Sequence, residues 1–187
     1  MRISRVGPQL LLWVCLLFFH AGCSLFFGSI RPVEERSSDY EISDPTIGNS
    51  DWIRVDSQKR KSGPANELNQ PDLTFQSKAT RSVISVNSVC KHYPGSAEPS
   101  SLQELTRQLL LGVSEIALRK EVSFKVDSTP ALETTVKGHI EGKSMVFRTV
   151  VMEKDRCVYD LMYFAEPQFF EKNTKIFSDF VDSLHIR

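Results

Sequence analysis

Four cysteines are the most chemically versatile residues in this 187-residue chain: Cys15, Cys23, Cys90 and Cys157. A cysteine pair can form a disulfide, and a single thiolate can act as a nucleophile, a redox centre or a metal ligand. Cys15 and Cys23 belong to an apolar N-terminal segment, whereas Cys90 and Cys157 lie in the body of the chain. The chemistry of each pair therefore depends on the cell compartment and on the elements that carry it.

The N-terminus has the pattern of an export signal. Residues 1–8 contain Arg2 and Arg5 and no acid, and Leu10 to Phe19 is a run of ten apolar residues. This pattern predicts a secretory signal peptide over residues 1–22. An uncleaved membrane-spanning helix over 9–30 is an alternative, since about 20 apolar residues cross a bilayer. Either way the rest of the chain lies on the outer side, because the arginines stay in the cytoplasm.

His20-Ala21-Gly22-Cys23 follows the apolar run and resembles the lipobox of bacterial lipoproteins. In that family the cysteine receives diacylglycerol and becomes the first residue after cleavage. Ala21 and Gly22 match the small residues of the pattern, whereas His20 departs from the apolar residue usual there. The resemblance implies an acylated Cys23, carrying palmitate, that anchors the chain at the periplasmic face of the cell envelope. Ser24 is not the aspartate that retains enteric lipoproteins in the inner membrane, so the outer membrane is favoured.

Export also bears on Cys90 and Cys157, because exported proteins of most bacteria mature in an oxidising compartment. Cys90 ends one predicted strand and Cys157 begins another. If these strands are antiparallel neighbours, the two cysteines lie at the same end of the sheet and form a structural disulfide. Two buried free cysteines are an alternative. A nucleophilic or redox thiol at Cys90 near His92 is another, although positions two residues apart on a loop give no fixed hydrogen bond between a thiol and a base.

Other patterns argue against several function classes. The chain has 23 basic and 23 acidic residues, and this balance disfavours a nucleic-acid surface. His92, His139 and His185 lack metal-ligand spacing, and neither a glycine-rich phosphate loop nor a Gly-x-Ser-x-Gly motif occurs. Arg148 and Asp160 interrupt apolar strands. A cross-strand ion pair, edge positions in the sheet, or polar groups in a ligand cleft would each explain them. We therefore expect no catalytic residues, cofactor or metal, and no enzyme.

Residues 51–187 have the pattern of one folded domain behind a lipidated, flexible tether over 23–50. A capping box at Ser101 to Glu104 and apolar residues spaced by three and four predict a helix over 102–118. A second helix begins at Pro167 and carries a heavy aromatic stripe. Alternating apolar residues predict seven strands: 52–55, 73–75, 82–90, 121–126, 132–140, 145–152 and 157–165.

The order of these elements predicts an α+β fold. Short turns between the last four strands favour an antiparallel meander. Strands 145–152 and 157–165 are apolar on both faces, so both faces of the sheet need a cover. We therefore expect a mostly antiparallel sheet of six or seven strands with helices on both faces.

This order, together with the ending Phe177 to Ile186, resembles the PsbP-like fold of an extrinsic photosystem subunit and several bacterial lipoproteins. Val89-Cys90 and Asp155 to Asp160 are also similar to segments of uncharacterised lipoproteins of this type. The resemblance implies an α/β/α sandwich over residues 51–187 and supplies no catalytic residues.

Together these features predict a non-enzymatic, lipid-anchored envelope protein that serves as an interaction or accessory module of an envelope complex. Its expected partners are the membrane, through the lipid anchor, and an envelope protein of unknown identity, with no nucleic acid. The alternative is a periplasmic carrier or sensor that holds a small or lipidic ligand between helix and sheet.

Overall fold

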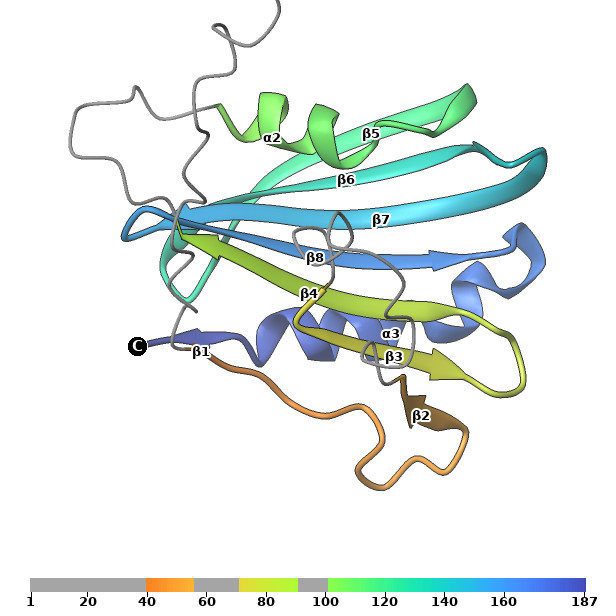
Figure 1. Cartoon of the computed structure of the whole chain (residues 1–187), viewed down its shortest axis with the longest axis horizontal. Coiled ribbons are helices and arrows are strands. Elements are labelled where there is room, and N and C mark those ends of the chain that lie inside the picture. Colours follow the sequence, from red (N-terminus) through yellow and green to blue (C-terminus); the bar gives the residue numbers. More distant parts are fainter. Residues whose placement is uncertain (1–39, 56–70, 91–100) are drawn as a thin grey trace, which may run out of the picture. The chain divides into compact units, whose positions relative to one another are not determined.

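The structure is a computed structural model, which describes residues 40–55, 71–90 and 101–187 (Figure 1). In these ranges no helix has the length and apolarity needed to cross a bilayer. The predicted signal peptide, the lipidation of Cys23 and the tether up to residue 39 lie outside the described residues.

One antiparallel sheet of seven strands forms the centre, in the order β2-β3-β4-β8-β7-β6-β5 (Figure 1). Its strands are β2 (Trp52–Arg54), β3 (Leu73–Ser77), β4 (Val83–Cys90), β5 (Ser114–Val126), β6 (Thr129–Ile140), β7 (Lys143–Lys154) and β8 (Cys157–Ala165). A separate pairing joins β1 (Tyr40–Glu41) to β9 (His185–Ile186). The seven predicted strands are present, and the last four form the expected meander.

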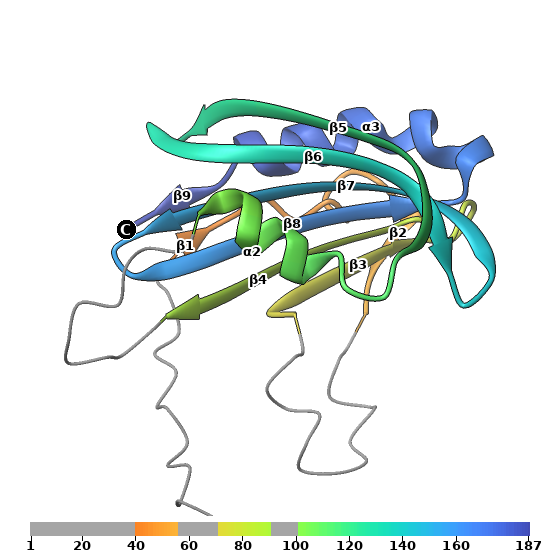
Figure 2. The ribbon, with the colours of Figure 1, turned by 90° about the horizontal axis from the view of Figure 1, so that it is seen from above.

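The two described helices, α2 (Leu102–Leu109) and α3 (Pro167–Asp182), lie on opposite faces of this sheet (Figure 2). On β7, Phe147 packs in the cluster beside α2, whereas Val146 and Val150 pack in the cluster beside α3. Adjacent strand residues point to opposite faces, so this division confirms the prediction of a helix on each face. We call the two sides the α2 face and the α3 face.

Aromatic rings hold α3 on the sheet. The ring of Tyr163 stacks on Phe170 at a centroid distance of 5.2 Å and on Phe177 at 5.7 Å. Its hydroxyl donates a 2.7 Å hydrogen bond to the carbonyl of Phe170. Buried Asn173 donates to the hydroxyls of Thr80 and Ser82 at 3.0 and 3.2 Å, which satisfies a polar group inside this interface. The aromatic stripe of the sequence is therefore core.

The first helix is shorter than predicted. The N-cap is as expected, because the amide of Glu104 donates to Ser101 Oγ at 3.1 Å. The helix predicted over 102–118 nevertheless ends at Leu109, and Gly112 follows with a φ of +97°, a conformation that glycine adopts at little cost. Residues 114–120 belong to β5 instead. The spacing of Val113 and Ile116 suggested a helix, but the glycine interrupts it.

The domain also begins earlier than predicted. Tyr40 pairs with Ile186 across β1 and β9, and Ile42 packs against the α3-face core. Residues 40–50 are therefore part of the folded domain, and both the predicted boundary at residue 51 and the tether assignment of 40–50 are wrong. A two-residue strand such as β1 shows no detectable periodicity, so the sequence pattern could not predict its pairing with β9 at the other end of the chain.

At Gly138 of β6, the residues at the start of β5 approach the backbone of β6 closely. A Cβ at this position would lie 2.6 Å from Val113 Cγ1 and 2.8 Å from the Ser114 carbonyl oxygen. We expect Gly138→Ala to lower the free energy of unfolding by about 1–3 kcal/mol, because the backbone of β5 must move. Exposed Lys137→Ala is the control and should change it by less than about 0.5 kcal/mol. Urea unfolding of the two variants measures the difference; equal midpoints would contradict this close approach.

Candidate functional site

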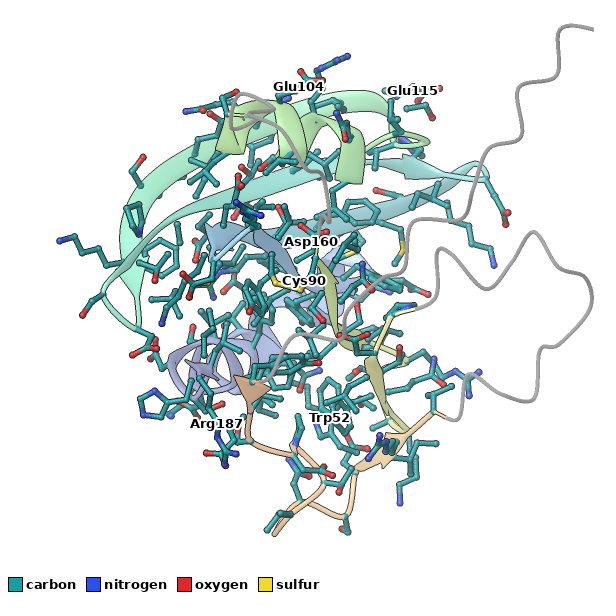
Figure 3. The ribbon with its side chains drawn as sticks, turned by 60° about the vertical axis from the view of Figure 1, so that its left-hand side comes forward. Trp52, Cys90, Glu104, Glu115, Asp160 and Arg187 are labelled. Carbon is teal, nitrogen blue, oxygen red and sulfur yellow. A yellow bond between two sulfur atoms is a disulfide. The ribbon has the colours of Figure 1, made fainter. Side chains whose placement is uncertain are left out.

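The disulfide lies between two central strands. Cys90 and Cys157 are directly opposite each other in the pairing of β4 with β8, with Cα atoms 3.9 Å apart and a sulfur–sulfur bond of 2.03 Å (Figure 3). This arrangement confirms the predicted pairing and its position at one end of the sheet. Because both sulfurs are bonded, the nucleophilic thiol considered for Cys90 is absent from this state of the protein.

The bond connects positions 67 residues apart in the sequence. The loop that it closes contains α2, β5, β6 and β7. For a loop of this size, the chain-entropy model gives a stabilisation of about 4 kcal/mol, because the unfolded chain loses freedom. The disulfide therefore secures the register of β4 against β8, and its role is structural.

Arg148 and Asp160 lie on opposite faces of the sheet and do not contact each other. Arg148 is opposite Tyr163 on the α3 face, whereas Asp160 is opposite Val151 and Asn87 on the α2 face. The prediction of a cross-strand ion pair is correct for Arg148, but with Glu133 of β6 as its partner at 2.7 Å.

Arg148 also binds α3. Its Nη1 donates to Ser178 Oγ at 3.0 Å, and its guanidinium carbon lies 5.5 Å from the ring centroid of Phe177. These contacts join β6, β7 and α3 through one partly buried cation. Arg148 thus stabilises the packing of α3 on the sheet.

Asp160 is the most unusual titratable group of the α2 face. Burial raises the pKa of its carboxyl from 3.8 to about 6, and no hydrogen bond or ion pair reaches it from residues 40–55, 71–90 or 101–187. A carboxyl with such a pKa can exchange protons near neutrality or bind a cation. Acid–base catalysis also requires a reacting group within hydrogen-bond reach. In the same ranges, no cluster of three metal-ligating side chains occurs.

A second carboxylate lies near the disulfide end of the α3 face. Asp72 Oδ2 accepts hydrogen bonds from the Tyr40 hydroxyl at 3.1 Å and from Ser88 Oγ at 2.5 Å. Burial, followed by the charge of Asp72, holds the pKa of Tyr40 well above its usual value, so its hydroxyl stays protonated. Ser88 donates directly to an acid, without an intervening histidine that could activate it as a nucleophile. This cluster therefore attaches β1 to the sheet.

The outer strand β5 offers a different kind of site. It is the last strand of the sheet, at the upper edge in Figure 1, and among the described strands none pairs with its outer side. Nearly all of its 13 residues are exposed, including Ile116 (46%), Leu118 (53%) and Val122 (44%). An edge strand presents unpaired backbone N–H and C=O groups, so it is a template for adding another strand.

Sequence reasoning missed this edge because it assigned Ile116 to the apolar stripe of the helix predicted over 102–118 and began the strand only at residue 121. The signal was present as a period of two, since Leu118, Val122 and Phe124 share one face of β5. Charged residues alternate with them, and Arg119 bridges Glu121 at 2.7 Å on the opposite face. The edge thus has apolar side chains on either side of Lys120 on one face, and the Arg119–Glu121 ion pair on the other.

Asp160→Asn tests the buried carboxyl. The pKa of Asp160 is raised in the folded state, so the folded protein favours the neutral acid, and ionisation costs stability as the pH rises through 6. We expect the variant and the parent to be equally stable near pH 4. Above pH 7 the variant should be more stable by up to about 3 kcal/mol, which corresponds to a shift of about two pKa units. Urea unfolding at both pH values measures this; a pH-independent difference would contradict it.

Comparison with known proteins supports the fold. No protein-family model and no curated protein matches the chain. Among solved structures, cyanobacterial PsbP (CyanoP) of Synechocystis sp. PCC 6803 matches with a TM-score of 0.54 and 14% identity, over 86% of this chain and 96% of that one. Weaker matches with TM-scores of 0.46 are PA94 of Pseudomonas aeruginosa, a protein of unknown function (14% identity, 81% and 85% covered), and LpqN of Mycobacterium tuberculosis, involved in cell envelope biogenesis (11%, 84% and 87%). The match with CyanoP shows that the domain has a PsbP-like α+β fold.

Proposed function

We propose that the chain is a lipid-anchored, non-enzymatic protein of the cell envelope whose domain docks an envelope protein along β5. The observation that carries this proposal is the long, exposed edge of β5, whose outer side none of the described strands pairs with and which exposes Leu118 and Val122 on one face. Protein partners commonly add a strand to such an edge, because main-chain hydrogen bonds supply affinity and alternate side chains supply specificity.

Two features support the envelope location. The export pattern and Cys23 of the sequence would anchor the domain outside the cytoplasm, at the periplasmic face and in the outer membrane rather than the inner. The Cys90–Cys157 disulfide is suited to the same side, because disulfides persist in oxidising compartments and are rare in the cytoplasm.

A carrier or sensor that binds a cationic or lipidic ligand on the α2 face is the second candidate, and Asp160 is the observation that favours it. A cationic ligand beside Asp160 would lower the pKa of this carboxyl by favouring the charged form. In protein purified from membranes, it would therefore abolish the pH-dependent stability gain predicted for Asp160→Asn.

The anchor is tested by Cys23→Ala in the full chain. We expect this variant to lose palmitate labelling, because the thioether that carries the diacylglycerol cannot form. Cys15→Ala is the matched control within the same apolar segment and should keep its label. Labelling that persists in Cys23→Ala would contradict anchoring at this residue.

The docking strand is tested in native membranes with a photo-crosslinking amino acid at Ser123, on the outer edge of β5. We expect a protein adduct at this position and none from the same group at exposed Asp179 of α3. Changing Glu121 to Pro in the crosslinking chain should remove the adduct, because proline cannot donate a main-chain hydrogen bond to an added strand. Glu121→Ala is the control and should retain the adduct. An adduct that survives the proline would contradict docking by strand addition.

A further inference from the structure

We propose that the partner of β5 is a second copy of this chain, paired antiparallel through β5 about a twofold axis at Lys120. The two seven-stranded sheets would then join into one continuous sheet. This inference rests on the proposed function of β5 as the docking strand, and it identifies the occupant of that strand.

The hairpin between β5 and β6 determines which backbone groups face outward. Val126 pairs with Thr129 across a turn of Asp127 and Ser128, whose φ angles of 45° and 65° are typical of a two-residue type I′ turn. The residues that flank such a turn form a hydrogen-bonded pair, and hydrogen-bonded positions then alternate along the strand. From Leu118 to Val126, where the register with β6 is regular, the even-numbered residues of β5 therefore bond to β6, and the odd-numbered residues direct their N–H and C=O groups outward.

The side chains of β5 are self-complementary about Lys120. In a twofold pairing centred there, Arg119 lies opposite Glu121 of the other copy, and Glu121 lies opposite Arg119. Leu118 lies opposite Val122. The outward-facing odd residues therefore meet one another, as main-chain hydrogen bonding requires. Opposite charges and apolar pairs directly across two strands each stabilise the pairing.

Neighbouring registers lack this match. An axis at Arg119 would place this residue against its own copy and Leu118 against Lys120. An axis at Glu121 would oppose two glutamates and bring Val122 against Lys120. Like charges directly across a strand pair are destabilising. The central register leaves one such contact, Lys120 with itself, where two long side chains can extend apart into water.

Among the described residues, apolar side chains on β5 are exposed to this partner. Helix α3 packs on β7 and β8, and the side chains of Leu118 and Val122 on the same face of β5 remain 53% and 44% exposed. A second copy would supply apolar neighbours for both. Two copies anchored in one membrane would also meet at a higher effective concentration than in solution, which compensates for the repulsion between the two lysines.

Cysteine crosslinking tests the register in the full chain, in native membranes. Lys120→Cys places two thiols across the axis, where Cβ atoms in a strand pair are about 4.5–5.5 Å apart. We expect a covalent dimer on a non-reducing gel. Ser123→Cys on the same strand is the matched control. Its two copies would lie about six residues apart along the strand, or roughly 20 Å, and should not join. A dimer with both variants or with neither would overturn the proposal.

Charge exchange tests the same pairing by a second route. In detergent micelles, Glu121→Arg should weaken self-association of the full chain about tenfold, because it opposes Arg119 with another arginine at two symmetric contacts. Adding Arg119→Glu reverses both charges and should restore association to within about threefold. Glu171→Arg on exposed α3 is the control and should leave association unchanged. Sedimentation velocity measures all four proteins, and failure of the double variant to recover would overturn the pairing.

These results separate the partner from the docking strand. If the photo-crosslinker at Ser123 yields a proline-sensitive adduct with a different protein and Lys120→Cys yields no dimer, the proposed function stands and the second copy is excluded. If neither crosslink forms, both proposals fail.

Discussion

The pairing of β4 with β8 is the interaction on which the rest of the domain depends. It joins the N-terminal strands β2–β4 to the C-terminal meander β5–β8, and every other neighbouring pair in the sheet lies within one of these groups. This pair alone connects the two groups within the sheet. Forming it costs conformational entropy, because the long loop between the two strands must be ordered. The Cys90–Cys157 bond is positioned on this junction and stabilises it by restricting the unfolded chain.

This junction also determines which strands are left at the edges. With β8 in the interior, the outer positions go to β2, which has three residues, and to β5, which has 13. A very short edge strand offers little backbone to a partner, whereas a long one is a docking surface or an aggregation hazard unless charged residues protect it. In the pairing that we propose, Arg119, Lys120 and Glu121 restrict the partners of β5 to those with a matching charge order.

Side-chain patterns over several residues were enough to predict the strands, α3 and the cysteine pair. The two-faced apolar strands β7 and β8 predicted a helix on each face, and the structure has both. The predictions failed where the deciding contact joins residues far apart in the sequence or depends on a single residue. The positive φ of Gly112, three residues after the end of α2, keeps a helix from continuing into residues 114–118, and Tyr40 pairs with β9 at the far end of the chain. The edge of β5 was hidden because Ile116 fits a helical stripe as well as a strand.

The balance of charges in the chain explains why recognition should depend on register. Arg119 and Glu121 lie 2.7 Å apart within one copy, so their fields cancel at distances beyond the Debye length of about 8 Å. A partner strand interacts with the individual charges only when it is in contact with β5. There, a shift of two residues in the pairing register replaces attraction by repulsion. Long-range steering would bring many proteins to the edge, whereas alternating charges reject those with the wrong spacing. A chain with equal numbers of acids and bases can therefore be selective without being electrostatically attractive.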